Sequence, residues 1–124
     1  MVTLLVTAAL DKKARDVSIL DLRGRVDYAD VLILCTASNA RQARAIADAV
    51  RRDAKTKCKL QPLSTEGFEQ GKWVLVDFGD VILHVFDEPM RSFYNIDSIW
   101  TDAKRLPVPD VEPSKDPTPL LSLP

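Results

Sequence analysis

Hydrophobic residues recur along the chain with two periods, one helical and one extended, and this pattern predicts helices interleaved with strands. Apolar side chains spaced about three or four residues apart near the amino terminus predict a short amphipathic helix that ends near Arg15. A second helix is predicted from a cap at Ser38 to about Lys57, because a serine hydroxyl can accept from the free amides of a first turn. One or two further helical turns are predicted over residues 90–100, limited on their amino-terminal side by Pro89.

Strands are predicted where apolar runs are short and bounded by polar residues. Such runs occupy residues 17–22, 30–36 and, more briefly, 60–63. The run at 30–36 is almost continuously apolar, as expected of a strand buried on both faces. Residues 72–86 are predicted to form two more strands around a turn at Phe78-Gly79. The sequence therefore predicts an α/β fold, a single domain with a mixed β-sheet packed with helices.

The two faces of the predicted hairpin differ in chemistry. A two-residue turn at Phe78-Gly79 pairs Asp77 with Asp80, and opposed residues share a face. The same register pairs Trp73 with His84. One face is aliphatic: Val74, Val76, Val81, Leu83 and Val85. The other is mixed: Trp73, Leu75, Asp77, Asp80, Ile82, His84 and Phe86.

This assignment of faces requires an even number of loop residues, because an odd loop or a bulge swaps the faces of one strand. The aliphatic face is predicted to pack on the helices. The mixed face has the composition of a protein-recognition surface, in which tryptophan is a common hot spot. Alternatively, Trp73 and Phe86 fill a second core layer under another helix. The pattern alone leaves both interpretations open.

Composition divides the chain of 124 residues into a body and a tail. We expect one domain over residues 1–105 and a disordered, proline-rich tail over residues 106–124. The formal net charge is −1, but its signs are separated along the chain. Residues 41–59 carry seven basic and two acidic side chains, whereas residues 60–103 carry eight acidic and two basic ones. A basic segment is thus followed by an acidic one.

The basic residues of the second predicted helix include four arginines, namely Arg41, Arg44, Arg51 and Arg52. They lie away from its apolar stripe, so a solvated polar face explains them. A patch that contacts ribosomal or other RNA is the alternative.

The two cysteines and the opening segment indicate a compartment. Cys35 and Cys58 are too few and too isolated for a disulfide framework or a metal knuckle, so we expect buried, reduced thiols. The apolar opening MVTLLVTAAL has no basic residue before it and is shorter than the roughly 20 residues of a membrane span. We therefore expect no signal peptide, no membrane contact and a cytoplasmic location.

Few residues of the chain suit catalysis. The letters Asp77-Phe78-Gly79 match a kinase motif, but the other kinase motifs are absent. Nucleotidyltransferases hold magnesium with carboxylates two residues apart on a strand, and the only acids so spaced lie in the tail. A magnesium-dependent enzyme of that kind using Asp77 and Asp80 remains the alternative function. His84 is the only histidine, so we expect no multi-histidine metal site, no cofactor and no enzyme activity.

Three separated stretches resemble the Iojap-like ribosomal silencing factor family of bacteria and organelles. They read LDKKARDVSILDLRG, ADVLILCTASNARQARAIADAV and EGFEQGKWVLVDFGDVILHVFDEPMRSFYNIDSIWTDA, and the resemblance covers about residues 4–103. It implies a nucleotidyltransferase-like topology without catalytic acids. It also implies a translational repressor that binds the large ribosomal subunit through ribosomal protein fourteen, blocks association with the small subunit when nutrients are limiting, and can form a homodimer when free.

The resemblance also assigns contact candidates, and the mixed hairpin face adds Phe86 to them. The family's tryptophan strand, Asp-aromatic-Gly-Asp turn, histidine, Arg-x-Phe-Tyr stretch and closing tryptophan are matched here residue by residue. The expected partner-binding residues are Trp73, Asp77, Asp80, His84, Phe86, Arg91, Tyr94 and Trp100.

Overall fold

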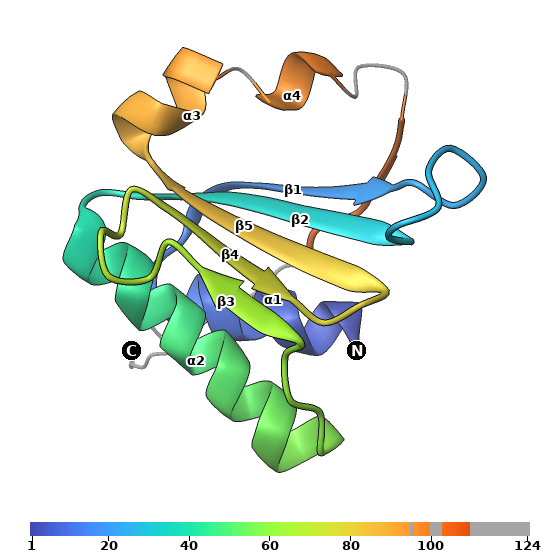
Figure 1. Ribbon diagram of the computed structural model, residues 1–124, viewed down its shortest axis with the longest axis horizontal. Coiled ribbons are helices and arrows are strands. Elements are labelled where there is room, and N and C mark those ends of the chain that lie inside the picture. Colours follow the sequence, from blue (N-terminus) through green and yellow to red (C-terminus); the bar gives the residue numbers. More distant parts are fainter. Residues whose placement is uncertain (95, 100–102, 110–124) are drawn as a thin grey trace, which may run out of the picture.

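The computed structural model describes residues 1–94, 96–99 and 103–109, apart from the side chains of Tyr94, Ile96 and Asp97. Its elements are α1 (Val2–Asp11), β1 (Arg15–Asp21), β2 (Val31–Ala37), α2 (Ala40–Cys58), β3 (Ser64–Glu66), β4 (Trp73–Asp77), β5 (Val81–Asp87), α3 (Glu88–Tyr94), α4 (Ile96–Ile99) and β6 (Lys104–Leu106). Figure 1 shows α1 and α2 against one face of the sheet and α3 and α4 on its other side.

The sheet is mixed, as the sequence predicts. Its six strands lie in the order β3-β4-β5-β2-β1-β6. The central pair, β2 and β5, is parallel, and the other neighbours are antiparallel. Every residue of β2 is buried, which confirms the prediction from its continuous apolar run.

Two apolar clusters lie on opposite faces of the sheet. The larger joins the buried sides of α1 and α2 to alternate residues of the strands, including Ile33 and Leu83. The smaller, on the other face, includes Leu20, Leu34 and Phe86, with Met90 of α3 packed against it.

None of the described helices combines the length and apolar character needed to cross a bilayer.

The first helix is shorter than predicted. Ala14 continues the helical spacing and is buried, but α1 ends at Asp11 and the chain turns through Lys13 at a φ of 66°. The amide of Ala14 donates to the carbonyl oxygen of Ala9 at 3.2 Å, so the turn satisfies the end of the helix and then leads into β1.

Asn39, and not the predicted Ser38, caps α2. The Oδ1 atom of Asn39 accepts from the amide of Gln42 at 2.8 Å. The amide of Ser38 donates to Oε1 of the same Gln42 at 2.6 Å, so Ser38 takes part through its backbone. The helix ends at Cys58, which is exposed, whereas Cys35 is buried as expected. The prediction that both thiols are buried is therefore wrong for Cys58, which lies on the terminal turn.

The two short edge strands have polar sequences. The apolar pattern predicts β3 at the wrong residues and gives no signal for β6. β3 lies at Ser64–Glu66 rather than at 60–63, because it is its pairing with β4 that defines it. β6 pairs with β1 and has no apolar run of its own.

Pro89 lies inside the first turn of α3, where the missing proline amide would have no helical partner. The Oδ1 atom of Asp87 accepts from the amide of Met90 at 2.9 Å.

Candidate docking surface

The β4–β5 hairpin has the predicted faces but a different register. Trp73 pairs with Phe86, and Leu75 pairs with His84. The predicted pairing of Trp73 with His84 is therefore wrong by two residues, because the loop between the paired residues Asp77 and Ile82 has four residues, 78–81, instead of two. Both loops are even, so the side chains of the two strands keep their predicted faces, while Asp80 lies in the turn between them. Val74, Val76, Val81, Leu83 and Val85 all belong to the larger cluster under α1 and α2.

Hydrogen bonds within the turn account for the longer loop. Oδ1 of Asp77 accepts from the amide of Gly79 at 2.7 Å, as in an Asx turn. The amide of Phe78 donates to the carbonyl oxygen of Val81 at 2.9 Å. Phe78 is then directed into the larger cluster and is only 6% exposed. Burial of this ring favours the four-residue loop over a two-residue turn with Phe78 at its exposed apex.

Three rings meet on the mixed face and form what we call the aromatic cluster: Trp73, His84 and Phe86. The ring centroids of Trp73 and Phe86 are 5.0 Å apart, and those of His84 and Phe86 are 5.9 Å apart and nearly parallel. Nε1 of Trp73 donates to Nδ1 of His84 at 3.0 Å. Trp73 and His84 are partly exposed, whereas Phe86 is completely buried. Phe86 therefore lies beneath the other two rings and supports them, and its predicted contact with a partner stays a prediction.

The environment of His84 keeps its imidazole neutral. Burial lowers the pKa of His84 from 6.5 to about 4, because an apolar surrounding disfavours the charged form. Nδ1 accepts the indole proton, so the ring's own proton is on Nε2. At neutral pH the aromatic cluster is thus an uncharged patch.

A hollow of about 450 Å³ opens beside Trp73. Trp73, Leu75 and Met90 supply its apolar lining, and Glu66 and Lys72 are among its polar residues. Met90 comes from α3, and the strand pattern on which the sequence prediction rests gives no signal for it. A wider hollow of about 890 Å³ lies between α2 and residues 67–70, but it has charged walls and lacks the aromatic cluster.

The two acidic candidates, Asp77 and Asp80, have different surroundings. The carboxylate of Asp77 belongs to the turn described above. Asp80 is exposed, and its carbonyl oxygen accepts from the amides of Asp30 and Val31. The described residues contain no group of three or more histidine, cysteine or acidic side chains that could hold a metal ion. In this structure the two aspartates shape and border one end of the hairpin.

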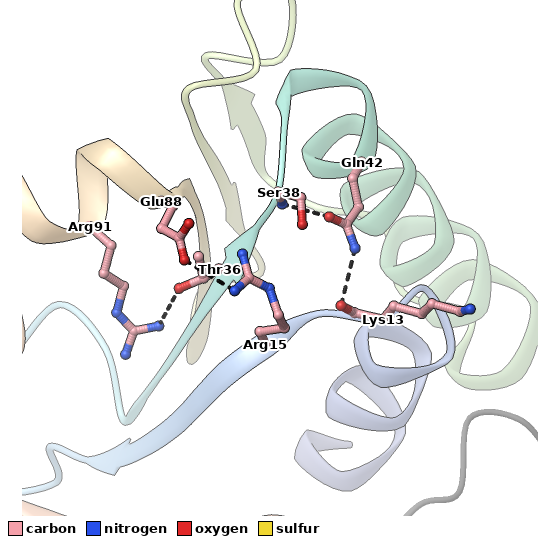
Figure 2. A network of polar contacts seen from close by, with 7 residues as sticks. All are labelled: Lys13, Arg15, Thr36, Ser38, Gln42, Glu88 and Arg91. Atoms are coloured by element: carbon pink, nitrogen blue, oxygen red, sulfur yellow. Dashed lines mark hydrogen bonds and ion pairs between the residues drawn. The ribbon is translucent and has the colours of Figure 1, made fainter.

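Arg91 does not line the hollow beside Trp73. Its side chain instead bonds α3 to the sheet. Nη1 donates to the carbonyl oxygen of Asp16 at 2.6 Å and to Oγ1 of Thr36 at 3.1 Å, while Nη2 donates to Oγ of Ser18 at 3.4 Å. Figure 2 shows the bond to Thr36. Arg91 thus positions the helix that carries Met90. The Tyr94 side chain and Trp100, two predicted contacts, lie outside the described residues.

The same network connects four elements at this end of the sheet (Figure 2). Arg15 of β1 pairs with Glu88 of α3 at 3.1 Å, and both side chains are substantially exposed. Nε2 of Gln42 donates to the carbonyl oxygens of Lys12 and Lys13, which joins α2 to the turn after α1. These contacts fix the framework on which α3 sits.

The arginines of α2 fall into two groups. Nη1 of Arg44 donates to the carbonyl oxygen of Glu69 at 3.0 Å. Arg51 pairs with Asp48 at 3.5 Å and lies over the ring of Phe68, 5.6 Å from its centroid. These two hold the 67–70 turn, whereas Arg41 and Arg52 are exposed.

Known proteins similar in sequence match most of this chain, and they are consistent with its fold. The family described as "Ribosomal silencing factor during starvation" matches residues 1–120. The ribosomal silencing factor RsfS of Bacillus subtilis is 40% identical over 93 residues, which are 75% of this chain and 78% of the relative. The chloroplastic protein Iojap of Arabidopsis thaliana is 31% identical over 105 residues, which are 85% of this chain and 43% of the plant protein.

Solved structures give the same result. A crystal structure of a protein from Chromobacterium violaceum has a TM-score of 0.76 and 32% identity, covering 90% of this chain and 91% of that one. A crystal structure of a Bacillus halodurans protein has a TM-score of 0.72 and 35% identity, covering 80% and 91%. The chain therefore belongs to the family of ribosomal silencing factors that includes the Iojap-like proteins.

Proposed function

We propose that this protein represses translation by binding the large ribosomal subunit through ribosomal protein fourteen and sterically blocking association with the small subunit. Its family is named for ribosomal silencing during starvation, which describes a regulator rather than an enzyme. The proposed site of action is the cytoplasm, where the subunits join.

The observation that carries the proposal is the partly exposed Trp73 beside a hollow that Leu75 and Met90 also line. Its indole is held on two sides, by a hydrogen bond from its nitrogen to His84 and by ring packing on Phe86. A rigid, partly buried tryptophan next to a hollow is typical of a binding hot spot. Exposed Asp80, at the turn of the same hairpin, favours a basic partner such as a ribosomal protein, whereas Glu66 and Lys72 in the lining of the hollow carry opposite charges.

A subunit-joining assay tests this function. Purified large and small subunits are mixed at magnesium concentrations that favour joining, with and without saturating protein, and are separated on sucrose gradients. We expect free large subunits that carry the protein and a loss of joined ribosomes. Undiminished joined ribosomes at saturation would refute the proposal.

A matched pair of variants locates the surface. Trp73→Ala is expected to weaken subunit binding by about 30-fold or more, as at a hot spot worth about 2 kcal/mol. Leu63→Ala removes an exposed apolar side chain that does not line the hollow, and it is expected to bind like the parent protein. Equal binding by both variants would place the docking surface elsewhere.

Ribosomal RNA is proposed as a minor contact of α2, made mainly by Arg41 and Arg52, because Arg44 and Arg51 hold the 67–70 turn. Replacing both exposed arginines by glutamine should lower the log–log salt slope of subunit binding by about 0.7–0.9 for each phosphate that is no longer neutralised. An unchanged slope would show that α2 does not touch the RNA backbone.

We also propose that the free chain forms a homodimer through the surface around Trp73. Dimerisation and subunit binding then exclude one another. Sedimentation equilibrium should show a dimer for the parent protein and a monomer for Trp73→Ala. A dimer that persists in the variant would assign self-association to another surface.

The alternative function, a magnesium-dependent nucleotidyltransferase using Asp77 and Asp80, has less support. One oxygen of Asp77 is bonded to the Gly79 amide, and this bond stabilises the turn. Titration calorimetry with magnesium and a nucleoside triphosphate tests it directly. Heat of binding that Asp77→Ala abolishes would favour the enzyme.

A further inference from the structure

Trp73 and His84 form one unit across two strands. They are diagonal neighbours on β4 and β5, because Trp73 pairs with Phe86 and Leu75 pairs with His84. The indole N–H can only donate, and Nδ1 of His84 accepts it at 3.0 Å. Phe86 packs against both rings from within the smaller cluster. The indole is therefore fixed by a directional bond as well as by packing.

The two imidazole nitrogens have different surroundings. Nδ1 is occupied by the indole, whereas the described residues supply no hydrogen-bond partner for Nε2. A histidine that contacted a partner directly would use Nε2, and one that acts through Trp73 would use Nδ1. The two roles can therefore be separated by replacing one nitrogen at a time.

Fixing Trp73 before docking reduces the entropy cost of binding, because the ring's two side-chain torsions are already set. Trp73 lines the hollow together with Leu75 and Met90, so a rotation of its ring would change the shape of that lining. The bond to His84 opposes such a rotation.

We propose that His84 is a positioning residue that acts through Nδ1 to hold the Trp73 indole in its docking orientation, an inference that rests on the proposed function for its binding partner. His84 carries out no chemical step. Its contribution to docking is transmitted by the indole hydrogen bond.

Two variants differing by one methylene test this inference. Asparagine places its amide atoms one bond beyond Cγ, where histidine has Nδ1, so His84→Asn retains an acceptor for the indole. Glutamine places its amide one bond further, near the position of Nε2, so His84→Gln loses that acceptor but keeps a polar group facing outward. Thermal melting first confirms that both variants unfold cooperatively.

The free protein gives the first readout. The Trp73 indole proton is assigned in the NMR spectrum as the signal missing from Trp73→Phe. We expect a downfield, exchange-protected signal in the parent protein and in His84→Asn, and an upfield, rapidly exchanging one in His84→Gln. A protected indole in His84→Gln would overturn the inference, whatever the protein binds.

Co-sedimentation with purified large ribosomal subunits gives the second readout. His84→Gln should bind about three- to tenfold more weakly than the parent, as expected for one hydrogen bond, and His84→Asn should bind nearly as well as the parent. The reverse order would assign a direct contact to Nε2 and overturn the positioning role. In a Trp73→Phe background the His84 substitutions should make no further difference.

Failure of the proposed function is distinguishable from failure of this inference. If the parent protein does not bind large subunits, the proposed function fails, while the indole signals of the free proteins still decide whether His84 positions Trp73.

Discussion

At the scale of single residues, the buried or paired state of two titratable groups controls how stability depends on pH. His84 is neutral in the fold because burial lowers its pKa to about 4. The side chain and the backbone amide of Arg23 donate hydrogen bonds to Asp21 and lower the pKa of this carboxyl from 3.8 to about 2. The two groups act in separate ranges of pH.

The free energy of unfolding should decrease in two steps as the solution is acidified. Between about pH 6.5 and 4 the unfolded chain binds a proton at His84 that the folded chain does not, so the stability due to the neutral ring, complete above 6.5, is lost. The contribution of Asp21 is complete above about 3.8 and is lost as the pH falls to about 2.

Urea unfolding over this pH range measures both steps. His84→Asn, which keeps an acceptor but does not titrate, should remove the upper step only, and Asp21→Asn should remove the lower one only. A parent curve that is flat between pH 6.5 and 4 would contradict a buried, neutral His84.

Gly67 allows the turn before β4 to lie close to the backbone of Trp73. Its φ is +73°, and a Cβ there would collide with the carbonyl group of Trp73. Gly24 has a similar φ of +82° but open space around it. Gly24→Ala should cost about 1–2 kcal/mol from the left-handed backbone alone, while Gly67→Ala should cost more and also weaken subunit binding. Urea unfolding and co-sedimentation measure the two effects, and equal costs would show that the Trp73 carbonyl can move aside.

At the scale of elements, α3 is short and depends on tertiary contacts. Its seven residues are too few for a stable isolated helix. Arg91 bonds it to Asp16 and Ser18 of β1 and to Thr36 of β2, while Asp87 caps its first turn. The position of Met90 in the hollow therefore depends on an arginine outside the hollow.

Arg91→Ala should destabilise the protein by about 1–3 kcal/mol, because it removes several charge-assisted hydrogen bonds. Arg15→Ala removes the exposed ion pair with Glu88 and should cost at most about 1 kcal/mol. Urea unfolding compares the two, and hydrogen exchange should show faster opening of α3 in Arg91→Ala alone. Similar behaviour of both variants would mean that Arg91 does not anchor the helix.

Elements with a strong apolar pattern could be predicted from the sequence, and those defined by their partners could not. β2 and α2 are specified by their own residues, one by a continuous apolar run and the other by a stripe. The end of α1 depends on a left-handed turn at Lys13, a conformation that the helical spacing of Ala14 conceals. β3 and β6 have three residues each, and only pairing defines them.

At the scale of the whole molecule, the sequence predicts which side chains of the site share a face, but not which residues lie beneath or beside them. Parity places Trp73 and His84 on the same face, whatever the length of an even loop. It does not show that Phe86 is completely buried beneath them or that α3 contributes Met90. Both depend on how a third element covers the sheet, which local pattern does not encode.

The strand β6 sets the proposed limit of the folded domain. It ends at Leu106, so the predicted boundary after residue 105 cuts through it. A chain shortened after residue 109 should melt like the full chain and still bind large subunits. A chain shortened after residue 103 should melt at a lower temperature, because β1 loses its outer neighbour. If both truncations melt alike, β6 is dispensable.

The parallel pairing of β2 with β5 also has a consequence for synthesis. Val31 pairs with Val81, so the central contact of the sheet joins segments that are far apart in the chain. Closing such a contact is slow compared with forming the adjacent β4–β5 hairpin. While the protein is being translated, β2 lacks its central neighbour until β5 has left the exit tunnel. A nascent chain therefore leaves the edge of β2 that later pairs with β5 without its backbone hydrogen bonds until most of the domain has been made.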